Sequence, residues 1–228
     1  SRMTLGEWMD QWLENIAGTI RHTTLTRYQG AIRIHINPHL GGKPITQVTG
    51  KDVQKLYDAL ASHGNQITGK GLASSTIRGI HSMLHEALDA AKQAGLIPWN
   101  PTEEIPTPKF ACKVKQILTD EQLDIFMAII QQDDIWHDFF YTELTTGLRL
   151  SEICGLMWSV FDPRKRTPSV NHTLCKEKVG CLVIGDTKTY TGTRKIALPD
   201  STAELLRNRK KCSYSVWILH CPLQPEAP

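Results

Sequence analysis

Repeated prolines near the middle of the chain restrict its fold more than any other sequence feature. Four prolines lie within Pro98–Pro108, and a basic stretch, Lys109–Lys115, follows them. Because proline lacks a backbone N–H and its ring clashes with the preceding turn, a regular helix cannot cross this segment. A chain of 228 residues is long enough for two modest domains. We therefore expect residues 98–116 to link a domain at 4–97 to a second domain at 117–228.

The first domain carries four amphipathic helical patterns. The first should start at a capping box of Thr4 and Glu7, and Thr49 should cap the third. The second should start near Thr23 or Thr24, and the fourth should open at Ser74 or Ser75. The second helix should end before Asn37, because the residue before Pro38 disfavours the helical conformation. The fourth and longest helix should end at Gly95.

The second domain combines helices with short strands. Thr119 and Gln122 form another capping box at its start. Helices are expected at 120–131, at 135–146, directly after Arg149 and at Ser201–Lys211, and strands near 168–173, 181–184 and 193–197. The predicted fold class is mainly α with a small β-sheet, a helical bundle followed by an α+β domain.

Composition narrows the function classes without choosing among them. The net charge of +3 and the isoelectric point of about 8.5 permit nucleic-acid binding but support it only weakly. The six cysteines contain no Cys-x-x-Cys pair, which is typical of reduced thiols rather than of disulfides or a zinc site. No signal peptide or long apolar run is present, so we expect a cytoplasmic protein without a membrane role. Ser1-Arg2-Met3 has the character of a cloning remnant.

Two patterns look like ligand sites but fall short of them. Gly64–Gly71 lacks the Ser or Thr that closes a P-loop, and it follows a predicted helix rather than a strand. His81 and His85 lie one helical turn apart, but no third metal ligand is evident. These histidines are expected to be partly buried helix positions or polar groups facing DNA. No cofactor and no metal are expected.

The segment Thr146–Leu156, TGLRLSEICGL, carries the most chemistry. It predicts a helix end at Gly147, an arginine at the break, and a new helix whose first turn holds Ser151 and Glu152. Arg149, held rigidly between two leucines, could grip a phosphate through paired hydrogen bonds. The alternative is a surface ion pair between Arg149 and Glu152, and the segment alone does not decide between them.

A lysine turn follows downstream of this segment. Lys188 stands in the turn Gly185–Tyr190, and a short strand then ends at Leu198-Pro199. The Thr-Gly-Leu-Arg-x-Ser-Glu box, the Thr-Lys-Thr hairpin and their order resemble the catalytic domain of tyrosine recombinases, the phage and transposon integrases. The upstream half resembles that family's core-DNA-binding domain, a SAM-like helical bundle. The resemblance covers nearly the whole chain from Thr4, and it looks closest to integrases of conjugative transposons.

The resemblance implies a reaction and a role for each residue. A tyrosine attacks a DNA phosphodiester and forms a 3′-phosphotyrosyl link without metal or cofactor, so that a second strand can be joined by reversal. Arg149 matches the arginine that stabilises charge on the phosphate, and Lys188 matches the lysine that protonates the leaving 5′-oxygen. Glu152 matches the acid that supports the arginine. The implied function is site-specific recombination of a mobile element; the alternative for Lys188 is a solvated turn lysine.

The resemblance also implies partners. In the family, two helices of the first domain approach the major groove and the linker runs along the DNA, so hydroxyl and basic groups there should bind phosphates. The expected DNA-binding residues are Arg21, Thr23, Thr24, Arg27, Tyr28, Lys70, Ser75, Thr76, Arg78, Lys113, Lys115 and Arg194. The alternative for Ser75 and Thr76 is ordinary helix capping, and which residues read bases stays open. The implied partners are double-stranded DNA at core recombination sites and other protomers, in a tetramer on paired sites.

The sequence departs from the family after the hairpin. The family pattern continues with His-x-x-Arg, a further His or Trp, and the tyrosine nucleophile. Here His220 is followed by Cys-Pro-Leu, and Tyr190 and Tyr214 come too early. We therefore expect a chain without the second half of the catalytic domain, which binds DNA without cleaving it. Two other classes stay open: a non-catalytic DNA-binding regulator derived from an integrase, and a helical interaction protein with no DNA role, which would show no salt-dependent duplex binding.

Overall fold

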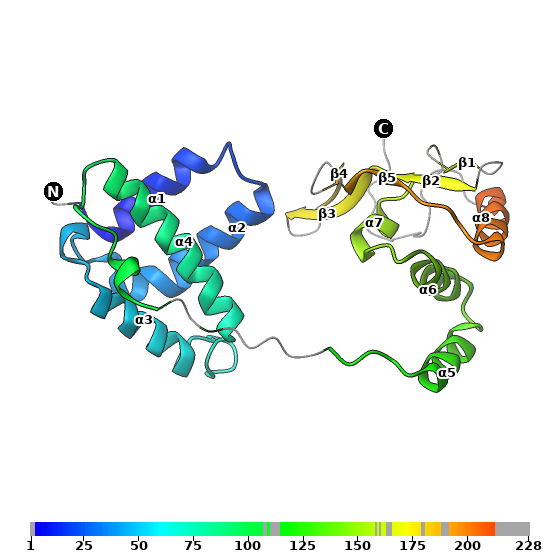
Figure 1. Ribbon diagram of the computed structural model, residues 1–228, viewed down its shortest axis with the longest axis horizontal. Coiled ribbons are helices and arrows are strands. Elements are labelled where there is room, and N and C mark those ends of the chain that lie inside the picture. The colour runs from blue at the N-terminus through cyan, green and yellow to red at the C-terminus, as the bar shows by residue number, and fades with distance from the viewer. Residues whose placement is uncertain are drawn as a thin grey trace. The chain divides into compact units, whose positions relative to one another are not determined.

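Two compact units make up the structure. The computed structural model describes residues 3–106, 109, 115–157, 159, 161–162, 166–178, 181–187 and 192–212. One unit lies within residues 1–114 and the other within 115–228 (Figure 1). Each unit has a hydrophobic core of its own. Within the described ranges, no helix is long and apolar enough to cross a membrane.

The first unit is a bundle of helices. Its elements are α1 (Leu5–Ile16), α2 (His22–Ala31), the π-helix η1 (Ile32–Gly41), the short η2 (Ile45–Gln47), α3 (Gly50–His63), α4 (Ser74–Gln93) and the short η3 (Pro101–Glu104). The predicted caps of α1 and α3 are confirmed, because Thr4 and Thr49 each form a capping box with the acid three residues on. Gly95 follows α4 with a φ of 72°, the left-handed conformation typical of a residue just past a helix end.

The predicted end of the second helix before Asn37 is wrong. α2 begins at His22 and runs without a break into η1, which continues through Pro38 to Gly41. In an α-helix the proline ring would meet the carbonyl of the preceding turn. The wider turn of a π-helix, whose hydrogen bonds span five residues, moves that carbonyl away. The extension also brings Leu40 into the core.

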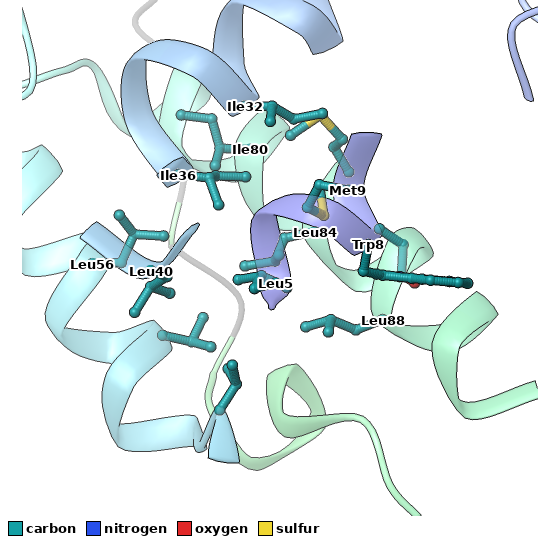
Figure 2. Packing of buried hydrophobic residues seen from close by; sticks show 14 of the residues in the cluster. Leu5, Trp8, Met9, Ile32, Ile36, Leu40, Leu56, Ile80, Leu84 and Leu88 are labelled. Carbon is teal, nitrogen blue, oxygen red and sulfur yellow. The ribbon is translucent and has the colours of Figure 1, made fainter. Parts of the chain in front are cut away.

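The core of the first unit lies where α1, η1, α3 and α4 meet. Figure 2 shows Leu5 and Met9 of α1 beside Leu84 of α4, with Ile36 of η1 and Leu56 of α3 in the same cluster. These side chains are at most 2% exposed. The burial of so much apolar surface from four elements makes this unit a rigid support for its outer face.

A buried polar network fixes the chain beyond α4. The Tyr57 hydroxyl lies 2.9 Å from His81 Nδ1, and the Thr102 hydroxyl lies 2.7 Å from His85 Nδ1. Asn100 donates to the His85 carbonyl oxygen at 3.0 Å and accepts from the Thr102 amide at 3.0 Å. Burial lowers the pKa of His81 and raises that of Tyr57. The two histidines are therefore packed helix positions, the first of the two alternatives that the sequence left open.

The glycine-rich stretch 64–71 connects α3 to α4. Asn65 organises it, because its side-chain oxygen accepts the backbone amides of Ile67 and Thr68 at 3.0 and 3.1 Å. The stretch follows a helix, whereas a P-loop follows a strand. Within the described ranges, no group of three or more His, Cys, Asp or Glu side chains could hold a metal ion.

The second unit combines helices with two small antiparallel sheets. Its elements are α5 (Asp120–Ile130), α6 (Asp134–Thr146), α7 (Leu150–Cys154), β1 (Phe161–Asp162), β2 (Thr167–Val170), β3 (His172–Lys178), β4 (Cys181–Asp186), β5 (Arg194–Lys195) and α8 (Asp200–Cys212). One sheet has the strand order β1-β2-β5, and the other is the β3-β4 hairpin. Thr119 and Gln122 form the predicted capping box of α5. The mainly helical fold with a small sheet component agrees with the prediction.

The strands differ in detail from their predicted limits. The single strand expected at 168–173 is divided at Asn171 into β2 and β3, which belong to different sheets. The last strand is only Arg194–Lys195 long, and β1 was not predicted. A strand of two residues has too few positions to show a period of two, so its sequence carries no pattern.

The core of the second unit lies among α6, α7, α8 and the three-stranded sheet. Phe139, Ile153, Phe161, Val170 and Leu206 are buried there. Two side-chain hydrogen bonds also join α6 to α8, one from the Tyr141 hydroxyl to Ser201 and one from Thr202 to Thr145, both 2.9 Å. These contacts hold the C-terminal end of α6 in place, and the arginine break follows directly.

Candidate functional site

The break between α6 and α7 has the form predicted from the sequence. α6 ends at Thr146, and Gly147 adopts a φ of 64°, a left-handed conformation that disfavours a side chain. Arg149 is the extended residue directly before α7. The predicted apolar setting is only half right, because Leu148 is buried whereas Leu150 is 63% exposed.

The C-terminal end of α7 packs closely against β3, and this contact fixes the position of the helix. A Cβ atom added to Gly155, the residue after α7, would lie 2.7 Å from the Thr173 Cα atom. Real Cβ atoms do not approach backbone so closely, so only glycine fits there. Because α7 is only five residues long, this contact at its C-terminal end also fixes the position of Arg149 at its N-terminal end relative to β3.

Glu152 is the centre of the site. Its carboxylate is 4% exposed and accepts four hydrogen bonds, which fills its lone pairs. Oε1 accepts a hydrogen bond from Arg149 Nη1 at 2.9 Å and another from Arg194 Nη1 at 3.0 Å. Oε2 accepts a hydrogen bond from the Arg149 backbone amide at 3.0 Å and another from Arg194 Nη2 at 3.0 Å. One buried carboxylate therefore binds two guanidinium groups, one from the residue before α7 and one from β5.

The electrostatics follow from this sharing. The bonds from Arg194, and then those from Arg149, lower the pKa of Glu152 to about 2, so the group is ionised throughout the physiological range. The same contact raises the pKa of Arg194. Two guanidinium groups against one carboxylate leave one positive charge unbalanced within the trio, and the Arg149 side chain, 76% exposed, carries it at the surface. The expected ion pair between Arg149 and Glu152 exists, but its acid is buried and shared.

Thr187 and Thr193, the described residues on either side of Lys188, meet beside this trio. The Thr187 and Thr193 hydroxyls lie 3.0 Å apart, which joins the two ends of the loop. Arg194 follows at once and donates to the Gly192 carbonyl oxygen at 3.2 Å. Lys188 lies outside the described residues, as does Lys113. Lys115 is described, and it is exposed in the segment before α5.

In the first unit, the structure brings two predicted DNA-contact clusters to one groove. A hollow of about 460 Å³ lies between the α2–η1 helix and α4. Arg27 and Tyr28 line it from one side, and Ser75 and Thr76 from the other. The Tyr28 ring stacks on Trp12 with 5.9 Å between ring centroids, which holds it against the core. The other predicted contacts in this unit, Arg21, Thr23, Thr24, Lys70 and Arg78, do not line the hollow.

Helix capping does not account for the hydroxyl groups at these helix starts. α2 begins after Arg21 and α4 after Ala73, and neither start has a side-chain cap hydrogen bond. Ser75 and Thr76 are both exposed within the first turn of α4. They are therefore available to a ligand in the groove.

Sequence reasoning missed two contributors to these sites. His35 lines the groove, and its spacing of seven residues from Tyr28 was the available signal, obscured by the expected helix end near Pro38. Arg194 was expected to touch DNA, whereas the structure bonds it to Glu152. No sequence pattern signals that pair, because 42 residues separate its members.

Known proteins resemble this chain along most of its length. Residues 4–61 match the family described as phage integrase, N-terminal SAM-like domain. The ICEBs1 integrase of Bacillus subtilis (strain 168) is 24% identical over 162 residues, which cover 70% of this chain and 44% of that protein. A tyrosine recombinase of Thermosipho africanus (strain TCF52B) is 26% identical over 152 residues, covering 65% of this chain and 52% of the relative. The chain thus spans about half the length of these curated relatives.

Solved structures share the fold. The Tn1549 transposon integrase in complex with a circular intermediate DNA matches with a TM-score of 0.78 at 26% identity, over 92% of this chain and 66% of that one. A lambda integrase (75–356) dimer bound to a COC′ core site has the same fold, with a TM-score of 0.71 at 22% identity over 99% of this chain and 76% of that one. Together with the arginine at a helix break and its buried glutamate, these likenesses show that the chain resembles tyrosine recombinases, the phage and transposon integrases, in sequence and in fold.

Proposed function

We propose that this chain binds duplex DNA through the groove of its first unit and presents Arg149 of its second unit to a DNA phosphate during site-specific recombination. The observation that carries the proposal is the trio of Arg149, Glu152 and Arg194, in which a buried, ionised acid orients an exposed guanidinium. The Glu152 carboxylate holds the Arg149 guanidinium from one side, and a positioned guanidinium is the group that binds phosphate through paired hydrogen bonds.

The chemistry available to Arg149 fits phosphate. Only one of its side-chain N–H groups is bonded within the described residues, to Glu152, so the remaining donors face outward. A planar guanidinium matches two phosphate oxygens at once. In strand cleavage, negative charge grows on those oxygens in the transition state, and a positioned guanidinium stabilises it more than it stabilises the ground state.

In this proposal, side chains of the first unit bind the phosphates of the duplex. Arg27 can neutralise a phosphate at the rim of the groove, while Ser75 and Thr76 can donate hydrogen bonds to neighbouring phosphate oxygens. The predicted contacts outside the groove, Arg21, Thr23, Thr24, Lys70 and Arg78, extend the same basic and hydroxyl surface along the DNA. The segment 98–116, with Lys113 and Lys115, links the two grips. Assembly with other protomers into a tetramer on paired core sites belongs to the same proposal.

The full reaction needs more groups than these 228 residues hold. In the proposed scheme Lys188 donates a proton to the leaving 5′-oxygen, and a tyrosine forms the 3′-phosphotyrosyl link. No His-x-x-Arg box followed by a tyrosine stands after the Lys188 hairpin in this sequence. We therefore propose that these residues bind core-site DNA without cleaving it. The second candidate, a regulator without catalysis, shares the DNA grip and differs in having no cleaving form.

Cleavage is tested with a nicked core-site duplex. The 228-residue chain should leave no covalent adduct on a denaturing gel, whereas a longer protein that adds the missing box and tyrosine should form one. In that longer protein, Arg149→Ala should abolish the adduct while core-site affinity stays largely intact. An adduct from the 228-residue chain contradicts its expected inactivity, and joint loss of binding and cleavage in Arg149→Ala makes Arg149 a structural residue.

Binding is tested by the salt dependence of affinity for a core-site duplex. Arg27→Gln should weaken binding and reduce the slope of log affinity against log salt by about 1, because one phosphate contact is lost. Lys55→Gln is the matched control, since it removes the same charge from an exposed position on α3 that does not line the groove. Equal effects of the two changes, or no salt-dependent binding at all, would contradict the proposed grip.

A further inference from the structure

Arg194 shares a carboxylate with Arg149, yet the two side chains are bonded very differently. Arg194 places both Nη atoms on the two oxygens of Glu152, each at 3.0 Å, and Nη1 also donates to the Gly192 carbonyl oxygen. Both N–H groups of Nη1 are therefore used inside the protein. Arg149 donates a single side-chain bond, from Nη1 to Oε1. Arg194 therefore has no free N–H group on Nη1, whereas the Arg149 side chain is held by a single hydrogen bond.

Exposure agrees with this division. The Arg194 side chain is 33% exposed, less than half the 76% of Arg149. A DNA phosphate that recruited Arg194 would have to compete with a buried carboxylate for donors already in use, and it would leave that carboxylate's charge uncompensated. These contacts argue against the role in DNA binding expected for Arg194 from the sequence.

The consequence of removing Arg194 can be followed through Glu152. Two of the four hydrogen bonds to its carboxylate would be lost, and a buried carboxylate with unfilled lone pairs is strongly unfavourable. Arg149 already bonds to the same carboxylate, and it could turn a second N–H group onto Glu152. The guanidinium of Arg149 would then withdraw from the surface into a two-point ion pair.

We propose that Arg194 is a positioning residue for Arg149, because it occupies half of the Glu152 carboxylate and so leaves the outer donors of Arg149 directed at a DNA phosphate. This role rests on the proposed function, since it specifies how the phosphate-binding group is presented. Arg194 also begins β5, directly after the loop that contains Lys188, so the same ion pair anchors the end of that loop to α7.

The first test needs no catalysis and uses the 228-residue chain. The Arg149 backbone amide donates to Glu152 Oε2, so its hydrogen exchange reports how firmly the carboxylate is held. Arg194→Gln should speed this exchange at least about tenfold, while core-site affinity stays within about twofold and the salt slope is unchanged. Lys195→Gln, an exposed neighbour on the same strand, should change neither. A lower affinity with a salt slope reduced by about 1 and unchanged exchange would make Arg194 a DNA contact instead.

The second test measures adduct formation from the nicked duplex in the longer, cleaving protein. Arg194→Gln should lower the single-turnover rate at saturating DNA by roughly tenfold or more without changing the DNA concentration for half-maximal rate. Adding Arg194→Gln to Arg149→Gln should reduce the rate no further, because the effect acts through Arg149. Arg194→Lys, which keeps the charge and one bond, should recover part of the rate and serves if the glutamine variant is unstable.

The outcomes separate this inference from the proposed function. A rate like that of the unaltered protein in Arg194→Gln, or fully additive losses in the double variant, overturns the positioning role alone. If the unaltered longer protein forms no adduct and its Arg149→Ala variant binds DNA as well as before, the proposed function fails. In that case the exchange of the Arg149 amide still decides whether Arg194 positions it.

Discussion

Both units hold an acid with a pKa of about 2, but they hold it in different surroundings. In the first unit, Asp52 lies in the capping box of α3, where the Lys43 ammonium and then the Thr49 hydroxyl lower its pKa. In the second unit, Glu152 is buried beneath two guanidinium groups. The first acid fastens a helix end near the surface. The second acid, Glu152, is a buried charge that orients the exposed guanidinium of Arg149.

The two units also differ in how many large apolar side chains they leave exposed among the described residues. The first unit surrounds one core with four elements, and its exposed large apolar side chains in the described ranges are Ile67 and Trp99. In the described part of the second unit the exposed ones are Ile117, Leu118, Ile125, Ile129, Trp136, Leu144, Leu150, Val183 and Ile184. The first unit thus resembles a self-sufficient scaffold, whereas the second combines a smaller core with a charged site and uncovered apolar side chains.

The largest expected effect tests whether the first unit is held by its core. Leu84 is fully buried between α1 and η1, so Leu84→Ala should destabilise that unit by about 3 kcal/mol through lost burial and a residual cavity. Hydrogen exchange measured peptide by peptide should show lost protection in residues 3–106 and unchanged protection in α6 and α8. Equal loss in both units would mean that they unfold together, and the contrast between them would fail.

The next effect compares the two acids as the pH falls. Each folded pKa, about 2, lies below the ordinary value of 4.5 for Glu152 and 3.8 for Asp52. Each acid therefore contributes stability that is fully present above about pH 5 and is lost as the pH falls toward 2, because the unfolded chain binds the proton first.

Substitution of each acid isolates its contribution. Glu152→Gln should cost the second unit about 3 kcal/mol at pH 7, as expected for a broken buried ion pair, and Asp52→Asn should cost the first about 1 kcal/mol. Urea unfolding between pH 7 and pH 2, followed by exchange in each unit, checks both. The acid dependence of a unit should weaken only when its own acid is replaced. A larger cost for Asp52→Asn would reverse the order proposed here.

A smaller effect compares the same motif in both units. Thr4 and Thr119 each close a capping box, so Thr4→Ala and Thr119→Ala should each cost about 1 kcal/mol, seen as faster exchange in α1 and α5 respectively. Thr4 also lies where the chain pairs with Pro44, so its loss should spread to neighbouring helices. α5 has no buried residue, so its loosening should stay local. If both losses stay local, the first unit is less cooperative than its core implies.

The smallest effect concerns the outer face of α5. Ile125 is 61% exposed, so Ile125→Ser should change stability by no more than about 0.5 kcal/mol. Thermal unfolding of the chain provides the measurement, with Leu84→Ala as the contrasting buried site. A cost near that of Leu84→Ala would show that this face of α5 is covered in solution.

Much of this architecture could be predicted from local patterns. The capping boxes at Thr4 and Thr119, the cap at Thr49 and the helix breaks at Gly95 and Gly147 depend on residues within one turn of each other, so they were found in the sequence. The rule that ended the second helix at Pro38 failed because it assumes α-helical geometry, and a π-helix relieves the clash it describes.

The sequence by itself determined the capped helix starts at Thr4, Thr49 and Thr119, the arginine at the break after Gly147, and the family resemblance that ties them together. Only the tertiary structure decided the partners of charged groups. Arg194 and Glu152 are 42 residues apart, and nothing local distinguishes an arginine that will meet a buried carboxylate from one that will meet a phosphate. The physical reason is that burial and pairing depend on which surfaces the folded chain brings together, whereas caps and turns depend on neighbouring residues.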